Sequence, residues 1–372
     1  MNFKRDLMKK ITRIITQSYI INFILISLLL GNSFVFAAQP NIQFSKNISC
    51  TNFAASFGDT VLFGNSEDGG LNHPLGLDPL SSRMFYYGAD AEGYGCAFVG
   101  WYWEGISVSI QGGMNDQGLC YDLTGIPNTP VNTPPNPTYT VAGSWIMKDV
   151  LRLNANVTEL IDFFMRCDWS GEWWFQWLFV DAFGDIVIIS PGIDGDLVFT
   201  RKNAGDDGFL TQTNFNRANN KSGSYPCWRY EASYELLSEI ESEEDLTPAK
   251  FNEVLDAVHF PKCGGSFTHY SNTFDSVNKL LYLNYMGNFD ETATINVTEE
   301  LEDTEFKAVP IADYFTEETA ENGYKNYKKW KGTNIFVYRV LPITAIVIVI
   351  SGILVGMYFL IKKLIKRTRS KT

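Results

Sequence analysis

Two long apolar runs flank a middle region in which apolar and polar residues alternate in short stretches. The second run, from Val340 to Ile361, has the ~20 residues that a helix needs to cross a bilayer. Six basic residues follow it, from Lys362 to Lys371. Because basic segments stay on the cytoplasmic side, we predict a transmembrane helix over 340–361 and a cytoplasmic tail over 362–372.

The first apolar run, from Tyr19 to Phe36, follows a basic segment and ends in Ala37-Ala38. That order is typical of a signal peptide, here 1–38, which is cleaved after small residues. An uncleaved signal anchor is the alternative, because the run is long. Both interpretations export the middle of the chain. We therefore predict a single-pass membrane protein whose main domain lies on the extracytoplasmic side.

Strand-like and helical patterns alternate in blocks along the middle region. Gly58-Asp59 is a turn signal between two β runs, so we expect a hairpin over 51–63 with Cys50 at the start of its first strand. Asn156 with Glu159 is the signature of a helix start. Further strands are expected over 96–110, 119–125, 174–181, 185–190, 196–200, 209–213, 271–275 and 280–285, and helices over 144–153, 157–167, 229–240 and 248–258.

Two segments lack such a pattern. The Pro- and Asn-rich stretch 127–137 is expected as a surface loop. The polar segment 313–339, with few apolar anchors, is expected as a stalk that joins the domain to the membrane helix. The order of strands and helices favours two stacked sheets with helices outside, an α+β fold, over a parallel α/β fold. We expect one domain over 50–312.

The chain has 372 residues and a formal net charge of −12, although both ends are basic, so the domain between them is strongly acidic. Such a surface repels phosphates, which argues against a nucleic-acid partner. The six cysteines and three histidines lack the paired spacing of a zinc site. We expect neither a metal nor a cofactor. With Cys50 set aside, an odd number of cysteines remains, which leaves at least one free thiol.

Cys50 is the main candidate for chemistry. A cysteine at a freed chain start carries its own base, an α-amine with a pKa of about 7.7 to 8.0 beside a thiol of about 8.5. Residues 39–49 would then be a propeptide, removed by attack of Cys50 on the bond after Ser49 or by an external protease. Two alternatives have less support. The residues before Cys50 form a poor lipobox, and a papain-like pair with His259 or His269 lacks its local motif.

Five motifs occur in a specific order and spacing. They are Cys50-Thr51 with Leu62 to Asp68, Gly112 to Leu119, Thr211 to Asn216, Trp228-Arg229-Tyr230, and Tyr270 to Asp275. In these motifs the chain resembles, over most of 50–310, the cysteine N-terminal-nucleophile (Ntn) hydrolases, which include choloylglycine hydrolases, penicillin acylases and acyltransferases, and carcinine-hydrolase-like proteins. The resemblance implies a four-layer αββα sandwich.

The resemblance also implies roles for four residues. The Cys50 thiolate would attack an amide carbonyl while its α-amine carries the proton, and water or a second amine would take the acyl group. Asp68 would position the α-amine and the thiol; the other interpretation is a turn-capping residue. The Asn214 amide would help bind the oxyanion, or else serve its own loop. Arg229 would stabilise the charge of the site, or else form a surface ion pair.

Two departures from the family pattern concern the substrate. Asn65 stands where bile-salt and penicillin V hydrolases have an arginine, and Gly69 where an aromatic residue is usual. The first departure favours the linear-amide, carcinine-like subgroup. The aromatic runs at 101–103 and 173–177 line an acyl pocket or fill the core.

The prediction is therefore an amidohydrolase or acyltransferase for a small-molecule amide with a linear carbon–nitrogen bond, anchored to the membrane by its C-terminal helix. The alternative is a catalytically inactive ectodomain of the same fold that binds a ligand or a cell-surface partner. The two differ at Cys50, because a binding module needs no free N-terminal thiol. Oligomeric state has no signal in the sequence.

Overall fold

The structure is a computed structural model that describes residues 48–70, 79–103, 107–135, 137–140, 146–219, 221–260 and 266–369. The predicted signal peptide over 1–38 and the predicted propeptide up to Asn47 lie outside these ranges.

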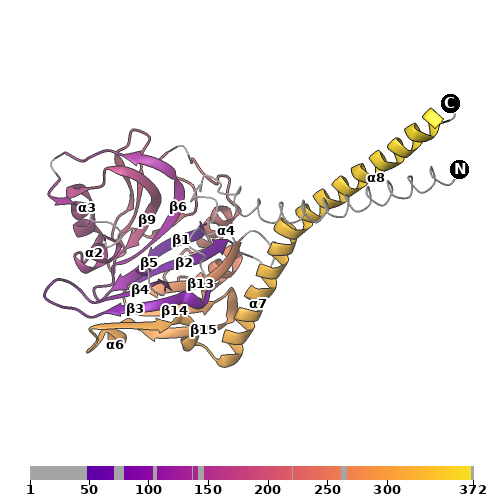
Figure 1. Cartoon of the computed structure of the whole chain (residues 1–372). Helices are drawn as coiled ribbons and strands as arrows, with labels where there is room; N and C mark the ends of the chain where they lie inside the picture. Colours follow the sequence, from indigo (N-terminus) through magenta and orange to yellow (C-terminus); the bar gives the residue numbers. More distant parts are fainter. Residues whose placement is uncertain are drawn as a thin grey trace. The chain divides into compact units, whose positions relative to one another are not determined.

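Within the described ranges, two antiparallel sheets form the centre of the domain (Figure 1). The strand orders are β12-β1-β2-β13-β14-β15 in the first sheet and β11-β10-β9-β6-β5-β4-β3-β16 in the second. The first sheet contains β1 (Ile48–Phe57), β2 (Thr60–Gly70), β12 (Gly208–Gln212), β13 (Ser266–Asp275), β14 (Leu280–Tyr285) and β15 (Asn288–Asn296). The second contains β3 (Ser82–Tyr87), β4 (Cys96–Trp103), β5 (Ser107–Asn115), β6 (Cys120–Val131), β9 (Gly171–Val180), β10 (Ile186–Pro191), β11 (Leu197–Lys202) and β16 (Phe306–Pro310). A short parallel pair joins β7 (Tyr139–Thr140) to β8 (Cys167–Asp168).

The hairpin expected around Gly58-Asp59 is confirmed, because β1 and β2 pair continuously up to Phe57 and Thr60. Gly58 takes a φ of +57°, which glycine adopts without strain. The strand differs from the expectation in one respect. It begins at Ile48 rather than at Cys50, so the last residues of the predicted propeptide are already part of the sheet.

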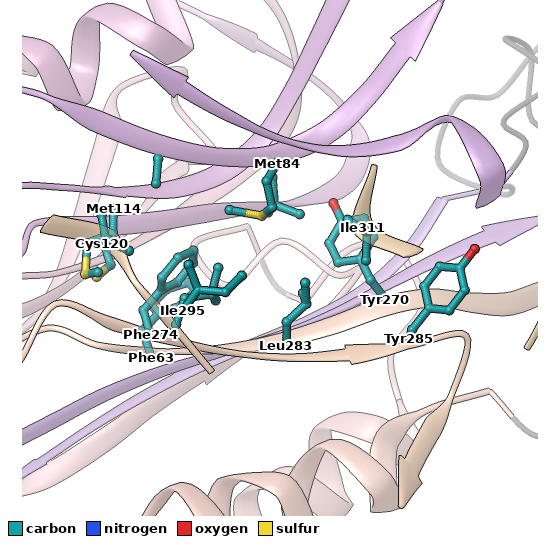
Figure 2. Packing of buried hydrophobic residues seen from close by; sticks show 14 of the residues in the cluster. Phe63, Met84, Met114, Cys120, Tyr270, Phe274, Leu283, Tyr285, Ile295 and Ile311 are labelled. Atoms are coloured by element: carbon teal, nitrogen blue, oxygen red, sulfur yellow. The ribbon is translucent and has the colours of Figure 1, made fainter. Parts of the chain in front are cut away.

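Alternation along the strands builds the core between the two sheets. Successive side chains of a strand point to opposite faces, and Ala54 and Phe63 of the hairpin point toward the second sheet. Figure 2 shows Phe63 and Phe274 from the first sheet packed in one cluster with Met84 and Met114 from the second. Removing this apolar surface from water stabilises the domain and holds the sheets face to face.

Helices cover the outer face of each sheet. Phe53 and Leu62, on the other face of the hairpin, pack against α4 and α5, and Phe164 of α3 packs on the second sheet. The helices of the domain are α2 (Ile146–Arg152), α3 (Val157–Arg166), α4 (Trp228–Leu237), α5 (Pro248–Val258) and α6 (Val297–Leu301). The layers are therefore helix, sheet, sheet, helix, and the predicted α+β sandwich is confirmed.

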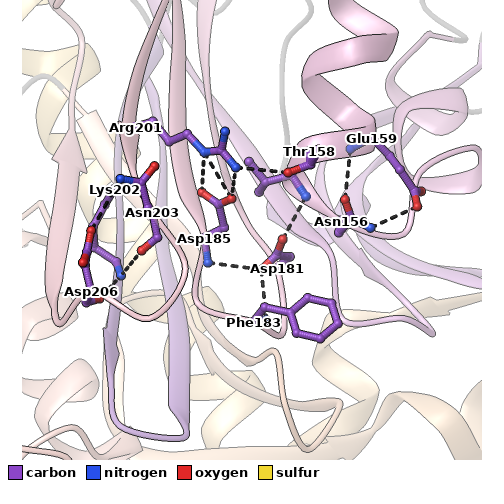
Figure 3. A network of polar contacts seen from close by, with 11 residues as sticks. Asn156, Thr158, Glu159, Asp181, Phe183, Asp185, Arg201, Lys202, Asn203 and Asp206 are labelled. Atoms are coloured by element: carbon purple, nitrogen blue, oxygen red, sulfur yellow. Dashed lines mark hydrogen bonds and ion pairs between the residues drawn. The ribbon is translucent and has the colours of Figure 1, made fainter.

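A polar network attaches the start of α3 to the second sheet (Figure 3). Asn156 Oδ1 accepts from the backbone N–H of Glu159 at 2.9 Å, and the Glu159 carboxylate accepts from the N–H of Ala155 at 2.8 Å. Asn156 is therefore the N-cap of α3, as expected from the sequence, and the Glu159 carboxylate binds the N–H one residue before the cap. Asp181, in the turn after β9, accepts from the N–H of Val157 at 2.9 Å. The first turn of α3 is thus held against the sheet.

The loop expected over 127–137 differs from the structure, in which β6 continues to Val131. β5 pairs with β6 at Cys120 and Tyr121, whereas β9 stays paired with it as far as Val131. Proline is tolerated where a strand is unpaired on one side or its register is irregular, because its nitrogen cannot donate. In β6 the register with β9 shifts between Gly125 and Thr129.

The segment expected as a polar stalk also differs. Most of it forms α7 (Glu317–Ile335), which Thr316 caps. Tyr327 and Trp330 are buried and lie on one face of the helix, each with its ring centroid 5.4 Å from that of Phe267. These two aromatic side chains, together with the buried Thr319, Gly323 and Asn334, dock a largely polar helix on the domain.

The transmembrane prediction has a counterpart in α8 (Leu341–Arg369). Within the described residues it is the one helix long and apolar enough to cross a membrane, over Leu341–Lys363.

Replacing Phe63 tests the core between the sheets. Phe63→Ala is expected to lower the free energy of unfolding by ~3–5 kcal/mol, because it leaves a cavity in a closely packed layer. Phe183→Ala, at a side chain that is 72% exposed, should change it by less than ~0.5 kcal/mol. Urea unfolding followed by tryptophan fluorescence measures both. Equal losses in the two variants would contradict the assignment of the core.

Candidate active site

Cys50 lies on the hairpin face that points toward the second sheet. It is directly opposite Glu67 in the pairing of β1 with β2. The side chain is fully buried, and its Sγ donates to Glu67 Oε1 at 3.4 Å. Alternation then places Thr51 and Asp68 on the opposite face of the same hairpin, beneath α4 and α5.

Arg229, in the first turn of α4, is the centre of a cluster on that opposite face. Its guanidinium donates to Asn214 Oδ1 at 2.7 Å, to Thr51 Oγ1 at 3.0 Å and to Asp68 Oδ2 at 3.4 Å. Asp68 also accepts from the Thr268 hydroxyl. Arg229 is only 3% exposed, which rules out the surface ion pair. The pair is a buried one, in which each charge depends on its partner.

Asn214 connects the two faces. Its Oδ1 accepts from the backbone N–H of Cys50 at 2.9 Å as well as from Arg229, and its Nδ2 donates to the Gly125 carbonyl at 3.0 Å. Asn214 follows β12, which pairs with β1, so the sheet brings it to the start of the hairpin. The structure therefore gathers Cys50, Asp68, Asn214 and Arg229 in one place. The amide nitrogen expected to bind an oxyanion is here bonded to a backbone carbonyl.

Burial determines how tightly the site holds its protons. It raises the pKa of the Cys50 thiol well above the ordinary value, and the carboxyls of Glu67, Asp122 and Asp68 raise it further. Burial also raises the pKa of Asp68 to about 7, against the opposing effect of Arg229. In the uncut chain the thiol therefore needs a base close by before it can act as a nucleophile.

Sequence reasoning missed two carboxyls, Glu67 on β2 and Asp122 on β6. Both are buried, and Glu67 Oε2 and Asp122 Oδ2 lack a hydrogen-bond partner among the described residues. Burial raises the pKa of Asp122 to about 8, and burial together with Asp122 raises that of Glu67 well above its ordinary value. Alternation along β2 could have found Glu67, since it shares a face with Phe63. Asp122 comes from the other sheet and had no such signal.

The two aromatic runs separate in the structure. Trp177 packs with Phe164 on the helix-covered face of the second sheet, so it belongs to the core. Trp101 lies between the sheets, with its ring centroid 6.0 Å from that of Tyr270, the residue that pairs with Glu67. Of these two tryptophans, Trp101 is therefore the one near the thiol side of the hairpin.

The histidines proposed as papain-type bases lie elsewhere. His259 follows α5, where its Nδ1 contacts the backbone oxygen of Asp256. His269 packs edge-on against Trp101, with 6.1 Å between ring centroids. The thiol of Cys50 bonds to Glu67 instead, and this geometry gives a papain-like pair no support.

No family model and no curated protein matches the sequence. Solved structures do match. A mutant of the conjugated bile acid hydrolase from Clostridium perfringens superposes with a TM-score of 0.52 at 14% identity, covering 70% of this chain and 96% of that one. Penicillin V acylase from Agrobacterium tumefaciens superposes with a TM-score of 0.50 at 18% identity, covering 70% and 91%. Both proteins are Ntn hydrolases. This chain has the Ntn-hydrolase fold.

The backbone nitrogen of Cys50 is the atom that a cut before this residue would change. In the uncut chain that nitrogen is a peptide N–H bonded to Asn214 Oδ1. Cutting the bond before Cys50 would turn this nitrogen into an α-amine on the same residue as the thiol. The guanidinium of the buried Arg229, which is paired with Asp68, donates to Asn214 and to Thr51, the residue after Cys50. Such an arrangement can supply a nucleophile and a base from one residue.

The buried carboxyls predict how stability depends on pH. Asp122 keeps its proton in the folded chain up to a pKa of about 8, whereas an unfolded Asp loses it near ~3.9. The unfolded chain binds fewer protons in that window, so the free energy of unfolding falls as the pH rises from ~4 to ~8.

Asp122→Asn removes one of these titrating groups. Between pH 5 and pH 8 its free energy of unfolding should fall by ~1 kcal/mol or more less than that of wild type. Each kcal/mol corresponds to a drop in apparent Tm from pH 5 to pH 8 that is about 2–4 °C smaller in the variant than in wild type. Thermal unfolding at the two pH values measures it, with Asp59→Asn at the exposed hairpin turn as the control. Parallel pH dependence in wild type and Asp122→Asn would contradict the assignment.

Proposed function

We propose that the chain is a cysteine-dependent Ntn amidohydrolase that cleaves a linear amide carbon–nitrogen bond through an acyl-enzyme on Cys50. One observation carries the proposal. In a fold shared with two amide-cleaving hydrolases, the buried Cys50 has its nitrogen 2.9 Å from Asn214 Oδ1, and Asn214 is in turn held by Arg229. A core cysteine without a chemical role would not require a buried arginine and carboxylate beside its backbone nitrogen.

The reaction begins once residues 39–49 have been removed. The α-amine of Cys50 takes the thiol proton, and the thiolate attacks the carbonyl carbon of the substrate amide. A C–S bond forms and the carbonyl oxygen becomes an oxyanion. The amine returns its proton to the leaving nitrogen as the C–N bond breaks. Water then hydrolyses the thioester, or a second amine takes the acyl group.

Asn214, Arg229 and Asp68 each act on this cycle. Asn214 Oδ1 keeps its place as acceptor for the Cys50 nitrogen, so it orients the α-amine. Its Nδ2 can stabilise the oxyanion if it exchanges the Gly125 carbonyl for the substrate oxygen, as a preorganised neutral donor would. Arg229 fixes the Asn214 amide in this orientation and favours the ionised form of Asp68 against the effect of burial, and a carboxylate near an amine favours its protonated form.

The proposal includes a membrane anchor at the C-terminus and a domain on the extracytoplasmic side. The length of α8, its apolar composition and the basic residues that follow it support both points. The substrate is a small molecule, and the acidic domain is unsuited to nucleic acid.

Cys50→Ala tests the nucleophile and the maturation together. Wild type is expected to begin at Cys50, and Cys50→Ala to keep residues 39–49 and to lose amidase activity at least ~100-fold, because both steps need the thiol. N-terminal sequencing, intact mass and hydrolysis of a panel of acyl anilides measure this. The matched control is Cys120→Ala, at a buried cysteine on the other sheet, which should be processed normally.

Two outcomes would contradict the proposal. Normal cleavage of Cys50→Ala would rule out self-processing. A wild-type chain that begins near Gln39 and hydrolyses none of the amides would favour the ligand-binding ectodomain.

Deleting the chain from Leu341 onward tests the anchor. The shortened protein should appear in the soluble extracytoplasmic fraction, because processing before Cys50 removes the N-terminal apolar run and the deletion removes α8. Fractionation and immunoblotting measure its location, with the full-length chain as the control. Retention of the processed, shortened protein in the membrane would show that α8 is not the anchor.

A further inference from the structure

The first cleavage cannot use the base that later turnovers use. Before the bond after Ser49 is cut, the nitrogen of Cys50 belongs to a peptide group, whose lone pair is delocalised into the carbonyl. It donates its hydrogen to Asn214 Oδ1 and cannot accept the thiol proton. A chain that cuts itself therefore needs a different group to deprotonate Cys50 once.

Glu67 is in place to be that group in the uncut chain. The structure has Ser49 and Cys50 joined within β1, and in this state Cys50 Sγ donates to Glu67 Oε1 at 3.4 Å. The contact follows from the strand register, since Cys50 and Glu67 are directly opposed and share a face. Among the described residues, Glu67 is the hydrogen-bond partner that the structure gives to this thiol.

The neighbouring carboxyls are less suited. Asp68 lies on the opposite face of the hairpin, engaged by Arg229 and the Thr268 hydroxyl. Asp122 comes from the second sheet, where its Oδ1 accepts from the Leu123 N–H at 2.6 Å. Glu67 and Asp122 each keep one carboxyl oxygen without a partner among the described residues, but the other oxygen of Glu67 accepts from Cys50 Sγ. Glu67 alone of the three carboxyls bonds to the atom that must lose a proton.

We propose that Glu67 is the general base of the self-cleavage that exposes Cys50, a role separate from that of the α-amine in amide turnover. The inference rests on the proposed function. Glu67 Oε1 takes the proton of Cys50 Sγ, and the thiolate attacks the carbonyl carbon of Ser49. A C–S bond forms, the C–N bond breaks, and Glu67 passes the proton to the departing nitrogen of Cys50. Water hydrolyses the thioester, which releases the Ser49 carboxylate and the free thiol.

The surroundings of Glu67 suit a single proton transfer. Burial and the nearby Asp122 raise the pKa of Glu67, so its ionised form is a stronger base than a carboxylate in water. The titratable groups around it are Cys50 on β1, Asp68 on the same strand, Asp122 on β6 and Tyr270 on β13. After cleavage the new α-amine, with an ordinary pKa closer to that of the thiol, takes over the proton.

The experiment follows processing of the full-length chain by pulse–chase translation into membranes, with the cut and uncut forms separated by mass. Glu67→Gln keeps the size of the side chain but cannot accept the proton, and should slow cleavage by ~100-fold or more, within the range of general-base contributions. The matched control is Asp275→Asn, at a buried carboxyl on β13 that accepts from Asn278 rather than from a thiol, which should be processed within about threefold of wild type.

A second variant keeps the test decisive where Glu67→Gln fails to fold. Glu67→Ala leaves space beside Sγ, and added formate should restore cleavage at least tenfold while leaving Cys50→Ala uncut. Thermal unfolding of each uncut chain reports whether it is folded. Wild-type processing rates in a folded Glu67→Gln chain overturn the proposal. So does an equal loss in a folded Asp275→Asn chain, since removing any buried carboxyl would then slow cleavage and the Sγ contact would not matter.

The processing and the activity of wild type separate a role of Glu67 from the amidohydrolase itself. If wild type is never cut at Cys50, self-processing itself is absent. If wild type is cut and hydrolyses amides while Glu67→Gln matures at the normal rate, the amidohydrolase stands and Glu67 is not the base.

Discussion

The pairing of β1 with β2 is the constraint on which the site depends. Because side chains alternate along a strand, this one register places Cys50 and Glu67 toward the second sheet and Thr51 and Asp68 toward the helices. A slip by one residue would exchange the two faces and bury the apolar residues of the hairpin on the wrong side. The register is held by packing on both faces, with Phe63 between the sheets and Phe53 under α5.

The carboxyl groups on the two faces of the hairpin have different partners. On the helix side, Arg229 compensates Asp68 and holds Asn214, so polar groups there are bonded and their positions are defined. On the inner side, Glu67 and Asp122 are buried together, and each has a carboxyl oxygen without a partner among the described residues. A carboxyl in that position holds a proton more strongly than usual. One face is suited to orienting a nitrogen and the other to accepting a proton.

Local pattern predicted much of the fold because its causes are local. The Gly58-Asp59 turn, the N-cap at Asn156 and the β-type runs depend on residues close in the chain. The predicted elements differed from the structure where contacts between residues far apart in the sequence determined the local conformation. β6 runs past Pro127 because β9 pairs with it there. The polar segment that includes Tyr327 is a helix docked on the domain, where Tyr327 and Trp330 contact Phe267, far away in the sequence.

The sequence by itself determined which residues are candidates and which faces of the strands are apolar, since residue type and period are written in the chain. It identified Cys50, Asp68, Asn214 and Arg229 through a family resemblance. Only the tertiary structure decided that Asn214 bonds to the Cys50 nitrogen, that Arg229 links Asn214 to Asp68, and that Arg229 is buried. It also brought Asp122 from the second sheet close to Glu67. The reason is physical: strand register and sheet stacking set distances between residues far apart in sequence, and no local pattern encodes those distances.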